Sequence, residues 1–191
     1  MFTIPNIITM FRIAIVPFFL SVLYTEIDNK LKILVFLIVL SGISDVLDGF
    51  IARKFNMKSA LGAVLDPFAD KLMQFSVLLC LLHYRWIPIG VVVFLFVKEL
   101  ILCIGAMYLY KKGCDVSSDY SGKTATFVFY ISSFAFIIFE PTNIIKFLLL
   151  TIIVLTALYA FINYSILFIK YTNIFKRNEK NGWEKQSWYY L

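Results

Sequence analysis

Four aspartates lie in apolar stretches of the chain, where carboxylates are costly. Asp45 and Asp48 are three residues apart and Asp66 and Asp70 are four apart, so each pair projects from one face of a helix. An acidic side chain at the centre of a membrane helix costs about 2.5–3.5 kcal/mol on insertion scales. Because such side chains need partners, the pattern indicates a functional cluster.

Oxygen ligands without histidine or cysteine favour hard cations such as Mg²⁺, Mn²⁺ or Ca²⁺. Two divalent ions would neutralise four carboxylates and still attract an anionic diphosphate, and two-metal sites carry out displacement at phosphorus. Ion pairing is the alternative, but the nearby basic residues are too few to pair with all four, namely Arg53, Lys54 and Lys71. The aspartates therefore predict a site for two divalent cations, Mg²⁺ or Mn²⁺.

The composition shows which elements must hold these residues. The chain has 191 residues, of which 61% are hydrophobic and 16% charged, whereas soluble domains have about 45–50% apolar and about 25% charged residues. A soluble enzyme, a disordered chain and a disulfide scaffold are thereby disfavoured. The net charge of +6 is attributed to basic loops facing anionic lipid rather than to binding of nucleic acid.

Six apolar blocks approach the length of a membrane-spanning helix: 4–24, 31–53, 60–83, 86–110, 120–139 and 144–169. We therefore expect an all-α integral membrane protein, a single domain over residues 1–191. It should form a bundle of six transmembrane helices with an N-terminal interfacial segment. Twelve of the 18 Lys and Arg residues fall on the side of the termini and four on the other, which predicts cytoplasmic termini in the cell membrane. The tail 173–191 is expected to lie at the membrane surface.

The aspartates belong to a longer pattern, Asp45-x2-Asp48-Gly49-x2-Ala52-Arg53-x8-Gly62-x3-Asp66-x3-Asp70. With this pattern the chain resembles the CDP-alcohol phosphatidyltransferases over about residues 5–126. The opening Asn6-Ile-Ile-Thr9-Met-Phe-Arg12 and the run 65–71 are similar to the branch of phosphatidylglycerophosphate and cardiolipin synthases.

The resemblance implies that Asp45, Asp48, Asp66 and Asp70 hold two divalent cations on the diphosphate of CDP-diacylglycerol. Asp70 would be the general base for the acceptor hydroxyl, which attacks the lipid-side phosphorus while CMP leaves. The site would face the cytoplasm, and the family's usual assembly is a homodimer. The implied CDP pocket is lined by Asp48, Gly49, Ala52, Arg53 and Gly62.

The acceptor is the open question. Phosphatidylglycerophosphate synthases resemble one another in a Gly-Lys-x-Lys-Thr element, where this chain has Ala125 in place of the second lysine. Glycerol 3-phosphate is the expected acceptor, phosphatidylglycerol is the alternative, and inositol phosphate or serine are less favoured. Intramembrane carboxylates also occur in divalent-cation transporters, a remote alternative. The cations available to an acceptor phosphate are Lys123, Lys111, Lys112 and Arg12.

Two further polar features are expected to have structural roles. Lys98 and Glu99 are adjacent and point about 100° apart on a helix, so each is expected to find its own partner on another helix. The single histidine, His83, ends the third block far from the aspartates and is expected to be an interfacial side chain.

Overall fold

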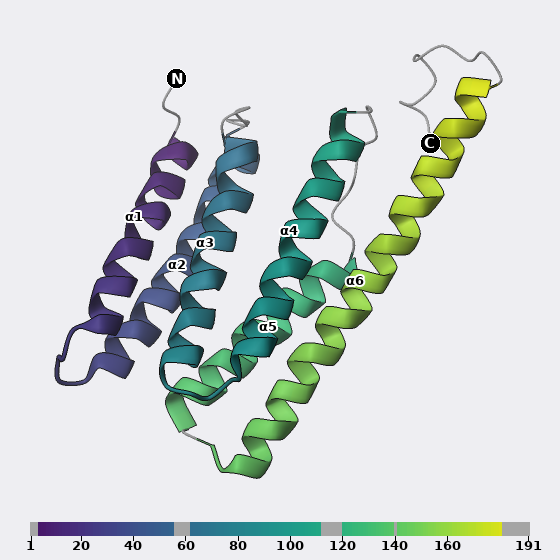
Figure 1. Ribbon diagram of the computed structural model, residues 1–191. Helices are drawn as coiled ribbons and strands as arrows, with labels where there is room; N and C mark the ends of the chain where they lie inside the picture. Colours follow the sequence, from purple (N-terminus) through teal and green to yellow (C-terminus); the bar gives the residue numbers. More distant parts are fainter. Residues whose placement is uncertain (1–3, 56–61, 112–119, 140, 181–191) are drawn as a thin grey trace. The chain divides into compact units, whose positions relative to one another are not determined.

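The computed structural model describes residues 4–55, 62–111, 120–139 and 141–180, which form α-helices joined by short turns. The helices are shown in Figure 1: α1 (Ile4–Tyr24), α2 (Lys30–Lys54), α3 (Gly62–His83), α4 (Ile89–Lys111), α5 (Tyr120–Phe139) and α6 (Asn143–Lys180). Each expected block corresponds to one helix. The all-helical class is confirmed.

Five of the described helices are long and apolar enough to cross a membrane. The remaining one, α3, has 22 residues, about 33 Å of helix at 1.5 Å per residue. Its first ten residues contain Asp66, Asp70 and Lys71, three charged side chains in close succession. Half of the acidic signature thus interrupts the apolar stretch of this helix.

The last helix is longer than a membrane requires. α6 has 38 residues, about 57 Å, against about 30 Å of hydrocarbon. Its apolar stretch is Asn143–Thr172. Residues 173–180 of the expected interfacial tail continue α6 instead of starting a separate helix, and residues 181–191 lie outside the described part.

The chain divides into two compact units, which are described separately. The first contains Met1–Ile87 and Ser133–Pro141. Within it α1 packs against α2 and α3 (Figure 1). Phe19, Leu23, Leu34, Met73 and Val77 are almost fully buried between these helices. Because α2 runs back along α1, the start of α1, the end of α2 and the start of α3 lie together.

Aromatic side chains gather at the opposite end of this unit. The ring of His83 lies edge-on to Tyr24 and Tyr84, with centroids 5.4 and 5.3 Å away. Tyr84 in turn stacks on Trp86 at 4.9 Å, and Lys30 Nζ lies 5.9 Å from the centroid of the Tyr84 ring. His83 lies far from the aspartates, as expected, because it packs where α1 and α3 end.

The second unit contains Pro88–Ser132 and Thr142–Leu191, and in it α4 packs against α6. The contact includes Gly105 of α4, where an added Cβ would lie 3.3 Å from Tyr164 Cε1 and 3.6 Å from Phe168 Cδ2. Close approach of two helices in a membrane depends on small residues of this kind. The absence of a side chain at Gly105 thus lets α6 place its aromatic rings directly on α4.

We predict that Gly105→Leu lowers the free energy of unfolding by about 1–3 kcal/mol, since overpacking forces the rings of α6 to move. Gly42→Leu is the matched control, because nothing lies within 4 Å of an added Cβ at that helical glycine. Thermal unfolding in detergent measures both. Equal melting temperatures for the two variants would contradict this account of the α4–α6 contact.

Candidate active site

Three helix ends bring the polar residues of the first unit together. Arg12 lies eight residues into α1, Asp48 six residues before the end of α2, and Asp70 eight residues into α3. At 1.5 Å per residue these positions are each about 9–12 Å from their helix ends. The antiparallel order of α1, α2 and α3 therefore sets the charged groups at a common depth.

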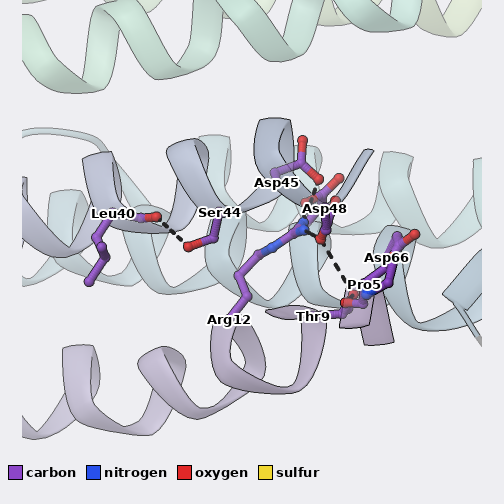
Figure 2. A network of polar contacts seen from close by, with 9 residues as sticks. Pro5, Thr9, Arg12, Leu40, Ser44, Asp45, Asp48 and Asp66 are labelled. Carbon is purple, nitrogen blue, oxygen red and sulfur yellow. Dashed lines mark hydrogen bonds and ion pairs between the residues drawn. The ribbon is translucent and has the colours of Figure 1, made fainter. Parts of the chain in front are cut away.

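The guanidinium of Arg12 contacts three of the four signature aspartates. Its Nη1 donates to Asp45 Oδ1 at 2.6 Å and to Asp70 Oδ1 at 2.5 Å, and its Nη2 donates to Asp48 Oδ2. Figure 2 shows the arginine extending from α1 towards Asp45 and Asp48. The Arg12 side chain is only 1% exposed, so these charge-assisted hydrogen bonds form away from solvent.

Thr9, one turn before Arg12, connects the fourth aspartate. Its hydroxyl lies 2.7 Å from Asp66 Oδ1, 3.4 Å from Asp48 Oδ2 and 3.0 Å from the carbonyl oxygen of Pro5 (Figure 2). All three are acceptors and the hydroxyl has one proton, so the shortest contact, to Asp66, is the main one. α1 thus supplies a donor to every aspartate of the signature.

The acidic cluster, defined as Asp45, Asp48, Asp66 and Asp70, has a closed side and an open side. The side chain of Asp48 is 4% exposed, whereas those of Asp45 and Asp70 are 46% and 50% exposed. Ser44 on the same helix is not a member, because its hydroxyl donates to the carbonyl of Leu40 at 2.8 Å (Figure 2). A ligand can therefore reach the cluster along Asp45 and Asp70.

The charges of the acidic cluster are not balanced by Arg12. Four carboxylates meet one guanidinium in these contacts, and they still outnumber the cations when Lys71, which acts on Asp70, is included. Unpaired charge is costly in such surroundings. The contacts of Arg12 and Thr9 engage one oxygen of each carboxylate. The second oxygens leave acceptor capacity for a cation.

The donor set fits Mg²⁺ or Mn²⁺, since it consists of carboxylate oxygens from facing helices. Within the described ranges no three Asp, Glu, His or Cys side chains are already arranged around a metal position. Instead, three of the carboxylates are gathered on the guanidinium of Arg12. Loading the site with cations would therefore require this arrangement to change.

The residues expected at the CDP pocket lie beside the acidic cluster in sequence. Gly49 and Ala52 are half-buried, Arg53 is exposed and Gly62 is buried. An added Cβ at Gly49 would lie 3.8 Å from Arg53 Nη2, so the arginine runs back along α2 over the glycine. This places a guanidinium next to a stretch of helix without bulky side chains.

The lysines expected to serve the acceptor belong to the second unit. Lys123 is exposed in the first turn of α5, whereas Ala125 is buried. Lys112 lies outside the described residues, and so does the side chain of Lys111. Arg12, which we assigned to the same role, is instead held by the aspartates.

One expectation from the sequence is wrong. Lys98 Nζ lies 2.6 Å from Glu99 Oε1, and the two side chains are 6% and 12% exposed. Adjacent residues start about 100° apart, but both side chains are long and flexible enough to bend towards each other. The cost of separate charges in an apolar environment favours that pairing.

Sequence reasoning also missed the partnership between Arg12 and the aspartates, since it considered only cations close to them in the chain. A signal for it was present. Asn6, Thr9 and Arg12 recur every three residues in an otherwise apolar helix, and all three are buried. Polar residues buried along one face of a membrane-type helix indicate a polar partner opposite.

Long apolar helices around a cluster of four carboxylates define a protein of the membrane class with a polar site among its helices. Comparison with known proteins identifies it further. Residues 2–162 match the model of the CDP-alcohol phosphatidyltransferase family, and the chain belongs to this family. With its apolar helices, membership makes it a multi-pass membrane protein.

Curated relatives carry two different names. A Haemophilus influenzae protein named CDP-diacylglycerol–glycerol-3-phosphate 3-phosphatidyltransferase is 35% identical over 48% of this chain and 51% of its own length. A Streptomyces coelicolor protein named cardiolipin synthase (CMP-forming) is 37% identical over 65% of this chain and 60% of its own. The human protein of the same name is 37% identical over 56% of this chain and 35% of its own length. The chain thus spans about half the length of the first relatives it matches.

We predict that Thr9→Val lowers the free energy of unfolding by about 1–3 kcal/mol, because the Asp66 carboxylate loses its hydroxyl donor. Thr9→Ser keeps the donor and should retain most of the stability. Thermal unfolding in detergent with a chelator present compares the two variants. If Thr9→Ser and Thr9→Val destabilise the protein equally, the Thr9–Asp66 hydrogen bond does not contribute to the stability of the fold.

Proposed function

We propose that this protein transfers the phosphatidyl group of CDP-diacylglycerol to an alcohol, releasing CMP in phospholipid biosynthesis. The observation that carries the proposal is the gathering of the four signature aspartates from α2 and α3, with Asp45 and Asp70 open to a ligand. The family match over residues 2–162 supports it, and the named relatives suggest the donor.

In this proposal Asp45, Asp48, Asp66 and Asp70 hold two divalent cations, Mg²⁺ or Mn²⁺. When bound, such ions polarise phosphoryl oxygens and acidify a nearby hydroxyl. Asp70 accepts the proton of the acceptor hydroxyl, whose oxygen bonds to the lipid-side phosphorus as the bond from that phosphorus to the CMP oxygen breaks. The 50% exposure of the Asp70 side chain suits a group that must meet an incoming alcohol.

The nucleotide would bind along the end of α2. Gly49, Ala52 and Gly62 have no bulky side chains, which suits close approach of a ligand to the backbone. Arg53 is exposed and lies over Gly49, where its planar guanidinium can bind a phosphate with two hydrogen bonds. Asp48 would contribute both to the cations and to the nucleotide.

Glycerol 3-phosphate is the proposed acceptor, and its product is phosphatidylglycerophosphate. Lys123 supports it, because this residue keeps the first lysine of the Gly-Lys-x-Lys-Thr element, and a lysine can bind an acceptor phosphate. Phosphatidylglycerol is the second candidate acceptor, and its product would be cardiolipin. The reason is Ala125, which replaces the second lysine of the Gly-Lys-x-Lys-Thr element and so removes one cation. Relatives with both names match the chain at similar identity.

We further propose that all six helices span the cell membrane, α3 included, and that both termini and the acidic cluster face the cytoplasm. The distribution of Lys and Arg between the loops supports this orientation. A homodimer is the proposed assembly, by analogy with the family. A divalent-cation transporter with the same aspartates would be distinguished by its failure to release CMP.

We predict that Asp70→Asn reduces CMP release at least about 100-fold, because general-base catalysis contributes about 10²–10⁴. Asp28→Asn is the control, since Asp28 is exposed in the turn before α2. The assay uses purified protein in detergent with CDP-diacylglycerol, Mg²⁺ and a panel of acceptors. An Asp70→Asn rate close to that of the control would exclude Asp70 as the base.

We also predict that Lys123→Gln raises the KM for glycerol 3-phosphate several-fold and leaves the KM for CDP-diacylglycerol unchanged, because only the acceptor loses its cation. Lys146→Gln, at the start of α6, is the charge-matched control. Steady-state rates with each substrate varied give both constants. An unchanged KM for glycerol 3-phosphate would favour phosphatidylglycerol as the acceptor.

A further inference from the structure

Arg12 is held in an unusual position for a buried arginine. Its guanidinium, which carries a single positive charge, contacts Asp45, Asp48 and Asp70 at once. Its Nε is buried and has no hydrogen-bond partner among the described residues. A buried donor without a partner is rare and costly, so this arrangement is not a fully satisfied clamp.

We propose that Arg12 is a resident counter-ion of the acidic cluster, which divalent cations displace when they bind. The inference rests on the proposed function, because it takes the four aspartates to be the cation ligands. It adds a role for a residue of α1, which lies outside the signature over residues 45–70.

The contacts show why arginine and cations compete. Arg12 takes Oδ1 of Asp45, Oδ1 of Asp70 and Oδ2 of Asp48, so it gathers these carboxylates around the guanidinium, and among the described residues no three ligands surround a metal position. A positive charge in contact with the ligands also repels an incoming dication. Each ion that binds therefore weakens the hold of the carboxylates on the guanidinium.

The other aspartate contact does not produce this competition. Thr9 is neutral and donates to Asp66 Oδ1 at 2.7 Å, so it orients that carboxylate without opposing a cation. α1 thus supplies one neutral donor and one charged competitor to the same cluster. The charged one keeps three carboxylates together when no cation is present, at a cost in cation affinity.

The test measures Mn²⁺ binding without substrate, by the electron paramagnetic resonance signal of free Mn²⁺. Purified full-length protein in detergent is compared with Arg12→Gln, which removes the charge, and Arg12→Lys, which keeps the charge but loses the two-nitrogen fork. Arg85→Gln is the control, since Arg85 is exposed in the turn after α3. Asp48→Asn reports whether the bound Mn²⁺ occupies the acidic cluster.

We expect Arg12→Gln to bind Mn²⁺ at least about tenfold more tightly than the unmodified protein, Arg12→Lys to lie between them, and Arg85→Gln to be unchanged. In a chelator Arg12→Gln should melt at a lower temperature, because Asp48 loses its buried partner. Saturating Mn²⁺ should then raise its melting temperature by more than that of the unmodified protein.

The inference would be overturned if Arg12→Gln and Arg12→Lys bound Mn²⁺ no more tightly than the unmodified protein. Arg12 would then help to position the carboxylates for the cations instead of competing with the cations. That result would leave the proposed function intact, provided that Asp48→Asn reduces Mn²⁺ binding. Failure of all the proteins to bind Mn²⁺ would instead overturn the cation site, and with it the proposed function.

Discussion

The balance of charge around Arg12 is the constraint on which the rest of the first unit depends. Charged groups placed among apolar helices must be paired or must bind ions, since the cost of leaving them alone is several kcal/mol. Here one guanidinium from α1 meets carboxylates from both α2 and α3. This cross-helix interaction ties three helix ends together and still leaves the cluster negative.

The packing of the unit follows from that requirement. An apolar core of residues such as Phe19, Leu34 and Val77 fills the middle of α1, α2 and α3, and aromatic rings around His83 occupy the far end. The packing of α1 against α2 and α3 places Thr9 and Arg12 against the aspartates. The three helices thus have a polar end, an apolar middle and an aromatic end. This order matches a group of helices that crosses from one membrane surface to the other.

Much of this could be predicted from the sequence, for physical reasons that also set the limits. Apolar blocks of membrane length predict helices well, and the bounds of α1 and α5 agree with the expected blocks. The three- and four-residue spacings correctly place each aspartate pair on a shared helix face. The pairing of Arg12 with Asp45, 33 residues away, depends on how helices pack, which one sequence does not reveal. The prediction for Lys98 and Glu99 was wrong because the direction of each side chain at the backbone was taken to fix the position of its charged end. Both side chains are long enough to bend towards each other.

The central claim is that the four aspartates form a binding site for two divalent cations, and diffraction tests it most directly. Crystals of the protein grown with Mn²⁺ and a CDP-containing donor would be measured at the manganese absorption edge. The account predicts two anomalous peaks, each about 2.0–2.6 Å from oxygens of Asp45, Asp48, Asp66 or Asp70, with Arg12 moved off these carboxylates. Anomalous peaks elsewhere, or a cluster without manganese and still closed on Arg12 beside bound nucleotide, would contradict it.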